Sequence, residues 1–122
     1  MSQQHASEER EEFPLELAFG TEELRDMCEH EATAIARLGL LAAAALKNRL
    51  SDVRAAEFMS DIVAGRPRSG VMSGLECFQF ELADRYVLTV VANHVPPRLD
   101  GDGRTDWSRV RRVKVVSVEA MQ

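Results

Sequence analysis

The sequence has few of the residues that stabilise small secreted domains or form zinc sites. Among its 122 residues there are two cysteines, Cys28 and Cys77, and no CxxC motif. Two isolated thiols do not provide the multi-disulfide framework of a secreted domain, and the usual zinc-ligand spacing is missing. The sequence therefore predicts a protein with reduced thiols, as is typical of the cytoplasm.

Long hydrophobic runs are also missing. The longest covers residues 38–46, whereas a membrane-spanning helix needs about 20 apolar residues. Residues 1–12 are polar and acidic, so they do not follow the basic and then apolar plan of a signal peptide. The sequence predicts a cytoplasmic protein that has no membrane partner.

Several motifs of catalytic and cofactor-binding sites are absent. There is no glycine-rich phosphate loop, no HExxH zinc motif and no nucleophile elbow. The segment that begins at Asp100 superficially resembles a calcium-binding loop, but its twelfth position is Arg111 instead of glutamate. A solvated turn is the simpler interpretation of this Asp- and Gly-rich segment, and no metal or cofactor is predicted.

The residues that are present indicate one globular domain with an uneven charge. Hydrophobic residues make up 45% of the chain, which is enough for a core, and the formal net charge is −5. Residues 1–65 hold 6 basic and 13 acidic side chains, while residues 66–122 hold 9 basic and 7 acidic ones. This balance excludes a uniformly basic nucleic-acid binder, and any phosphate-rich partner is expected to meet the C-terminal half.

Hydrophobic periodicity predicts the order of the secondary-structure elements. Apolar residues that alternate with polar ones favour strands, whereas spacings of three and four favour helices. Glycine, proline and aspartate indicate loops at 65–74 and 93–106. The expected elements are a strand at 13–19, helices at 21–38 and 40–56, a short helical turn at 57–63, and strands at 77–82, 86–92 and 110–118.

This β-α-α-β-β-β order predicts the fold class α+β. We expect a small antiparallel sheet with an N-terminal helical hairpin packed on one face. Residues 1–12 are expected to be a disordered acidic tail, and residues 13–122 to form a single domain.

The last expected strand carries a pair of cations on one face. Arg112 and Lys114 are two positions apart, so their side chains leave the same face roughly 7 Å from each other. Such a pair suits the phosphodiester backbone of a nucleic acid, and it equally suits an edge strand that must not aggregate. Arg109 and Arg111 lie near the start of the strand with the other parity.

The loop at 93–106 and the turn after it contain three residues of interest. His94 directly follows a strand and could be a general acid or base, or an ordinary polar loop residue. Trp107 is expected to anchor the loop on the core, although it could also stack on an RNA base. Asp106 is expected to form a hydrogen bond within its own turn.

A series of short motifs runs through the chain from residue 13 onward. They are Leu15-Glu-Leu-Ala-Phe-Gly, Leu24-Arg-Asp-Met-Cys-Glu, Ala36-Arg-Leu-Gly, Gly65-Arg-Pro67, Ala92-Asn-His-Val-Pro-Pro, Asp106-Trp-Ser-Arg-Val110, Val113-Lys-Val-Val and Val118-Glu119. In this order they resemble the HigB-like proteins of the RelE/ParE toxin superfamily. The resemblance implies a RelE/ParE-like fold and the toxin component of a type II toxin–antitoxin system.

The resemblance also implies an activity and partners. Such toxins enter the ribosome and cut messenger RNA without a metal ion or cofactor, which inhibits translation, or in the ParE branch they act on DNA gyrase. A cognate antitoxin, often a helix-turn-helix protein, neutralises them. RNA cleavage needs activation of a 2′-hydroxyl, protonation of the leaving oxygen and cations around the phosphorane.

Two sets of candidate site residues follow for this chemistry. The candidates for catalysis are His94, Tyr86 and Lys114, of which Lys114 matches a basic position of the family. The candidates for binding RNA phosphates are Arg85, Arg109, Arg111, Arg112 and Lys114.

The sequence departs from the family at two places, and the departures support other hypotheses. Val87 stands where relatives commonly carry an arginine after the strand tyrosine. Ala120, Met121 and Gln122 replace an Asp-Tyr-His end, and none of them can transfer a proton. A second hypothesis is therefore a catalytically degenerate toxin homologue that binds its antitoxin or another protein target. A third is an unrelated α+β interaction domain.

Overall fold

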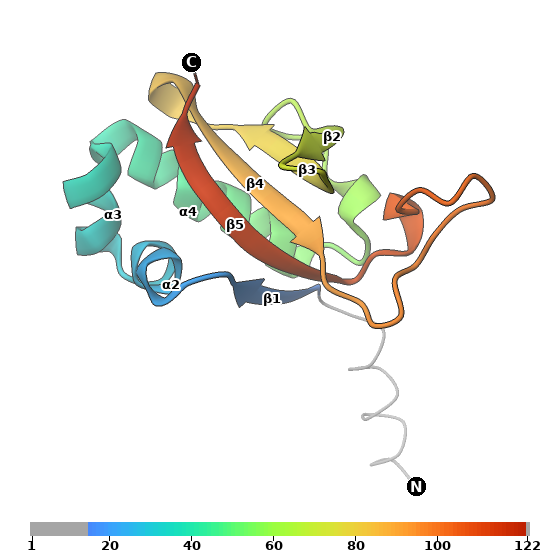
Figure 1. Cartoon of the computed structure of the whole chain (residues 1–122). Coiled ribbons are helices and arrows are strands. Elements are labelled where there is room, and N and C mark those ends of the chain that lie inside the picture. The colour runs from blue at the N-terminus through green and yellow to red at the C-terminus, as the bar shows by residue number, and fades with distance from the viewer. Residues whose placement is uncertain (1–14, 122) are drawn as a thin grey trace, which may run out of the picture.

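The computed structural model describes residues 15–121, which form a five-stranded sheet with helices packed on one face (Figure 1). The expected tail at 1–12 and the first two residues of the expected strand at 13–19 lie outside the described residues. Among the described residues, no helix has both the length and the apolar character that crossing a bilayer requires.

The described residues contain strands, α-helices and short 3₁₀-helices. The strands are β1 (Glu16–Phe19), β2 (Arg68–Met72), β3 (Leu75–Glu81), β4 (Tyr86–Ala92) and β5 (Arg112–Ala120). The α-helices are α2 (Glu22–Glu29), α3 (Glu31–Leu38) and α4 (Leu40–Ala55). The 3₁₀-helices are η1 (Met59–Asp61), η2 (Ala83–Arg85) and η3 (Trp107–Arg109).

The fold class α+β is confirmed, but the expectation of a purely antiparallel sheet was wrong. The strand order is β1-β5-β4-β3-β2, and β1 runs parallel to β5, with Glu16 opposite Arg112 and Phe19 opposite Val115. The other neighbouring strands are antiparallel, so the sheet is mixed. Periodicity shows which face of a strand is buried, but it carries no information on the direction of the neighbouring strand.

The expected helical hairpin is a set of three helices. The segment expected as one helix at 21–38 is interrupted at His30, whose φ of −126° and ψ of 114° are extended. Thr21 caps α2 as expected, because its hydroxyl oxygen accepts a hydrogen bond from the Leu24 amide at 3.1 Å. Gly39 separates α3 from α4 with a φ of +88°. The apolar spacing continues through the interruption, because α2 and α3 both pack against α4.

Strand β2 lies in the segment 65–74 that was expected to be a loop. It pairs antiparallel with β3 through the two-residue turn Ser73–Gly74, in which φ is +53° and +81°. Positive φ at both central residues is typical of a type I′ hairpin turn. Most side chains of β2 are exposed, so this edge strand lacks the apolar alternation by which strands are recognised in a sequence.

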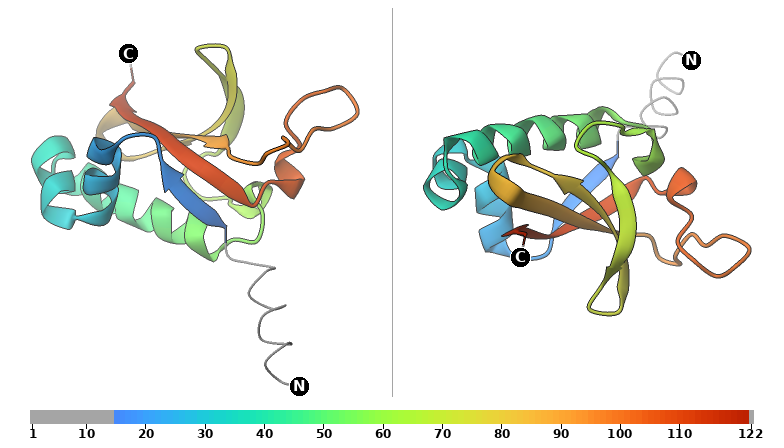
Figure 2. Two further views of the ribbon diagram at one scale, coloured as in Figure 1. Left: turned by 60° about the horizontal axis from the view of Figure 1, so that its bottom comes forward. Right: turned by 90° about the horizontal axis from the view of Figure 1, so that it is seen from above.

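The core lies between the sheet and the helices, as two views of the ribbon show (Figure 2). Helix α4 covers most of the length of the sheet in these views. The core side chains with at most 1% exposure are Ala42, Leu46, Leu50 and Val53 from α4, together with Met59, Phe80, Leu88, Val90, Val110, Val113 and Val115.

Replacement of Gly39 by alanine tests the corner between α3 and α4. A Cβ atom at Gly39 meets no atom within 4 Å, so the effect of Gly39→Ala comes from the positive φ alone. We expect the free energy of unfolding, measured by urea denaturation, to fall by about 1–3 kcal/mol. Gly101→Ala is the matched control, because Gly101 also has open space around its Cβ position but no positive φ. Equal stability of the two variants would contradict the strain at Gly39.

Candidate functional site

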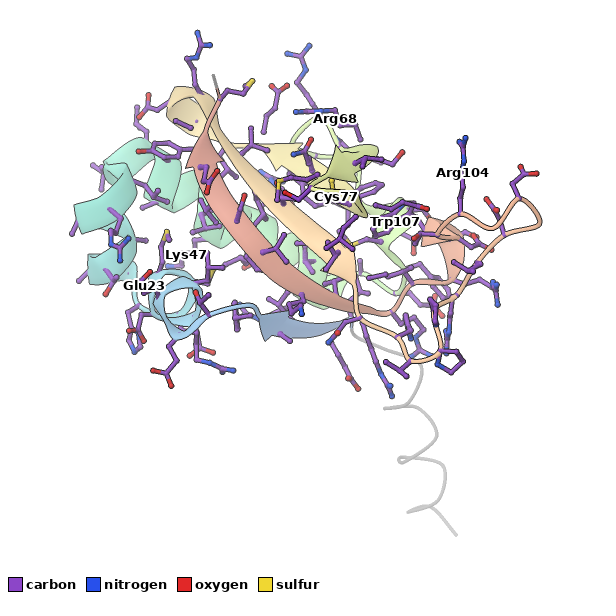
Figure 3. All side chains as sticks on the ribbon, viewed as in Figure 1. Glu23, Lys47, Arg68, Cys77, Arg104 and Trp107 are labelled. Carbon is purple, nitrogen blue, oxygen red and sulfur yellow. The ribbon has the colours of Figure 1, made fainter. Side chains whose placement is uncertain are left out.

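The face of the sheet opposite the helices is here called the open face. It carries small side chains that are buried. Thr89 and Cys77 are each 1% exposed there, although the helices pack on the other face. The Gln79 side-chain amide donates a hydrogen bond to Thr89 Oγ1 at 3.1 Å across the β3–β4 pair. Burial raises the pKa of the Cys77 thiol, and this effect is larger than that of the Arg68 charge, which lowers the pKa. Figure 3 labels Cys77 and Arg68 on neighbouring strands.

Most cations of the open face are neutralised by carboxylates. Arg112 Nε lies 3.2 Å from Glu16 Oε1, so β5 and the parallel β1 are also joined through their side chains. At the other edge, Arg68 lies 3.4 Å and Arg66 lies 3.8 Å from the carboxylate of Glu81. These pairs are solvent-exposed and stabilise the fold little, by about 0–1 kcal/mol each.

Lys114 differs from these arginines. It is half-buried, and among the described residues no ion pair is formed by its ammonium group. It lines a hollow of about 430 Å³ at the end of the sheet. The hollow is lined by Gly74, Leu75, Glu76, Val91, Ala92, Asn93, Pro97, Thr105 and Lys114.

The hollow exists because two neighbouring strands separate. The pairing of β3 with β4 ends at Phe78 and Val90, yet β3 begins at Leu75 and β4 continues to Ala92. The unpaired ends of the two strands flank the hollow, and the loop that follows β4 closes it. Figure 1 shows this loop extending from the end of the sheet that is opposite η2.

The loop is fastened to the sheet by hydrogen bonds and an aromatic contact. The Thr105 amide donates to Glu76 Oε1 at 2.7 Å, across 29 positions of sequence. The Trp107 ring packs against Phe78 with 5.1 Å between the ring centroids, and the tryptophan is partly buried on the core (Figure 3). Trp107 therefore anchors the loop, as expected from the sequence.

Two acidic residues of the loop, Asp100 and Asp106, form hydrogen bonds within their own turns. Asp106 Oδ1 accepts a hydrogen bond from the Ser108 amide at 3.2 Å, as expected, and Asp106 Oδ2 lies 3.0 Å from Arg109 Nε. The side-chain hydrogen bonds from Ser108 and then Arg109 lower the pKa of the Asp106 carboxyl. Asp100 Oδ1 accepts from two backbone amides of its own turn. Within residues 15–121, no group of three or more His, Cys, Asp and Glu side chains is arranged to hold a metal ion.

His94 is buried and holds the start of β5. Its Nε2 accepts hydrogen bonds from the Arg111 amide at 2.9 Å and the Arg112 amide at 3.2 Å. The imidazole must therefore be neutral, with its proton on Nδ1. Desolvation, followed by the charges of Arg98, Arg112 and Arg111, lowers the pKa of His94. The lone pair of Nε2 already accepts hydrogen bonds from the backbone. It is therefore not available for His94 to act as a general base.

The other candidates are spread over both ends of the sheet. Tyr86 pairs with Ala120 and packs on the core side, at the far end of β4 from the hollow. From Tyr86 to Ala92 the strand extends roughly 20 Å. Arg85 lies in η2, next to the C-terminal end of β5 (Figure 1), where its carbonyl accepts from the Met121 amide at 2.6 Å.

The remaining candidate arginines also have local partners. The Arg109 guanidinium donates a hydrogen bond to the Leu99 carbonyl at 2.8 Å, which connects η3 to the loop. The Arg111 guanidinium lies 6.0 Å from the centroid of the Phe58 ring. The structure thus places Arg112 and Lys114 on the open face and His94 against the backbone of Arg112, whereas Tyr86 and Arg85 lie at the other end of the sheet.

Sequence reasoning missed Glu76 and Asn93, which share the hollow with Lys114. They come from β3 and from the start of the loop, so their proximity depends on the strand pairing and on the bond from Thr105. No spacing in the sequence indicates this arrangement.

A second hollow lies among the helices. It also has a volume of about 430 Å³ and is lined by residues of α2, α3 and α4, including Cys28 and Lys47. Burial raises the pKa of Cys28 to about 11, so its sulfur is a protonated thiol near neutral pH. It is not an activated nucleophile.

The buried imidazole predicts a pH dependence of stability. Because the pKa of His94 is lower in the folded state than in the unfolded state, the unfolded chain binds more protons once the pH falls below about 6.5. The free energy of unfolding should therefore decrease from that pH downward, until the folded-state pKa is passed.

The variant His94→Gln tests this contribution by urea denaturation at pH 7.5 and 5.5. The glutamine keeps an acceptor at the ε position but cannot titrate, so the loss of stability between the two pH values should be smaller than in the wild type. His30→Gln, at an exposed position between α2 and α3, should retain the wild-type loss. An unchanged pH dependence in His94→Gln would contradict the neutral-acceptor role.

No protein-family model, curated protein or solved structure matches the chain significantly. The geometry of the open face and of the hollow beside Lys114 therefore carries the functional argument.

Proposed function

We propose that the chain is a toxin-type protein of the RelE/ParE superfamily that binds a single RNA strand in the ribosome through its open face and the hollow at Lys114. The observation that carries this proposal is Lys114, a half-buried residue beside the hollow whose ammonium group has no ion pair among the described residues. A cation that has no counter-charge in the protein remains available to attract an anionic ligand. Short motifs throughout the chain support the choice of family through their resemblance to HigB-like toxins.

The surroundings of Lys114 favour a phosphodiester strand over a large acidic protein surface. Arg112, whose ion pair with Glu16 is solvent-exposed, lies two residues away on the same strand, and the C-terminal half of the chain has more basic than acidic side chains. The hollow is concave and has apolar walls formed by Leu75, Val91 and Pro97. Single-stranded nucleic acids are bound by such combinations of cations with surfaces that cover the faces of bases.

The proposed activity is binding without cleavage. Cleavage of RNA needs groups that accept and donate protons beside the scissile phosphate. His94 uses its acceptor nitrogen for backbone amides, and Tyr86 lies at the far end of β4. Ala120 and Met121 have no group that titrates. This combination favours the catalytically degenerate form of the toxin over the endoribonuclease, and the same family implies a helix-turn-helix antitoxin as its partner.

Induced expression of the chain alone distinguishes binding from cleavage. We expect that mapping of messenger RNA 5′ ends shows no new ends at ribosome positions, because backbone amides occupy the acceptor nitrogen of His94 and Tyr86 lies at the far end of β4. Folded protein in the cell extract is the control for expression. New 5′ ends that appear on induction would establish an endoribonuclease and would overturn binding without cleavage.

The variant Lys114→Ala tests the RNA contact itself. Its affinity for a single-stranded RNA hexamer, measured by fluorescence anisotropy, should fall by about tenfold, and the slope of log affinity against log salt should decrease by about 0.7, the value for one lost phosphate contact. Lys47→Ala is the matched control, because Lys47 is an exposed lysine of α4 on the helical side (Figure 3). The absence of wild-type binding, or equal binding by both variants, would contradict the proposed function.

A further inference from the structure

We infer that the hollow beside Lys114 accepts one guanine nucleotide of the bound RNA strand, with Glu76 recognising the edge of the base and Lys114 contacting a phosphate. This inference rests on the proposed function, which it extends from RNA binding to base preference. It follows from the size of the hollow, from its apolar walls and from the two residues of opposite charge that line it.

The hollow has the size and the walls of a small-molecule site. Its volume of about 430 Å³ lies within the range of about 300–1,000 Å³ that is typical of ligand pockets. Leu75 is 59% exposed beside it, and Val91 and Pro97 also contribute apolar surface. The flat face of a nucleobase would cover these side chains and remove their apolar surface from water.

Glu76 is held in place but retains capacity to accept hydrogen bonds. Its Oε1 accepts from the Thr105 amide at 2.7 Å, which fixes the carboxylate in the wall of the hollow. Within the described residues, Oε2 has no hydrogen-bond partner. An ionised carboxylate accepts hydrogen bonds and donates none, so it selects a ligand edge that carries N–H donors.

Guanine is the base that offers such an edge. Its N1–H and its N2 amino group are neighbouring donors, and both can point at one carboxylate. Adenine and cytosine place an unprotonated ring nitrogen beside their amino group, and uracil places carbonyl oxygens on both sides of N3–H. These acceptors would face the acceptor oxygens of Glu76, which is unfavourable.

The two charges come from strands that are not neighbours in the sheet, so a ligand that contacts both must have two separate polar ends. Glu76 belongs to β3 and Lys114 to β5, and β4 lies between these strands. β3 has already separated from β4 at the level of Glu76, which leaves the space of the hollow between the two groups. A nucleotide carries its donor edge at one end and its phosphate at the other, so it can contact both groups at once. A free phosphate carries no N–H donors for the carboxylate of Glu76.

The test compares two RNA hexamers that differ in one base, UUGUUU and UUAUUU. We expect the wild-type protein to bind the guanine-containing hexamer about tenfold more tightly by fluorescence anisotropy, which is the discrimination of a good bidentate contact. Glu76→Gln should reduce this preference to about twofold or less, because an amide N–H replaces one acceptor oxygen. The amide oxygen of glutamine can still accept from Thr105, so the loop retains its attachment. Glu119→Gln is the matched control, because Glu119 is an exposed carboxylate near the far end of β5.

Inosine in place of guanosine provides a test that does not depend on the folding of a variant. Inosine lacks the N2 amino group, so the wild-type protein should bind the inosine hexamer several-fold more weakly than the guanosine hexamer. Equal affinity for the guanosine, adenosine and inosine hexamers would overturn the guanine site while RNA binding stands. Failure to bind any of the hexamers would overturn the proposed function itself.

Discussion

The two hydrogen bonds that His94 accepts from the backbone hold the chain where β5 begins, at the end of the sheet that carries Lys114. They satisfy the amides of Arg111 and Arg112, where the chain enters β5. A buried amide without an acceptor costs about 1–3 kcal/mol, so a neutral imidazole stabilises this position of the strand. The position of β5 in turn places Arg112 beside Glu16 on β1, and it places Lys114 two residues later in the hollow.

The hollow combines features that the rest of the open face lacks. Elsewhere on this face, arginines are neutralised by nearby carboxylates. At Lys114 the separation of β3 from β4 leaves space beside a lysine that has no ion pair among the described residues, and the bond from Thr105 to Glu76 closes that space with the loop. A charged group with no local partner, next to a cavity, is more suited to a ligand than to fold stability.

The same geometry bears on the choice between binding and cleavage. The residues proposed for proton transfer, His94 and Tyr86, are separated by most of the length of β4, and both contribute to the fold. The groups that remain around Lys114 suit the recognition of a nucleotide. Under the proposed function, the protein would bind RNA by contacts to phosphate and base, without the acid and base needed to break the strand.

The sequence by itself determined the α+β class, helix α4, the strands β4 and β5 to within a few residues, and the anchoring role of Trp107. These features depend on local periodicity and on residue type, which a single sequence shows directly. It did not determine the parallel pairing of β1, the interruption at His30, strand β2 or the partner of His94. The tertiary structure decided these, because each depends on contacts between residues distant in the chain. The hollow has the same origin: Glu76, Asn93 and Lys114 belong to β3, to the loop after β4 and to β5, and only strand pairing and loop closure bring them together.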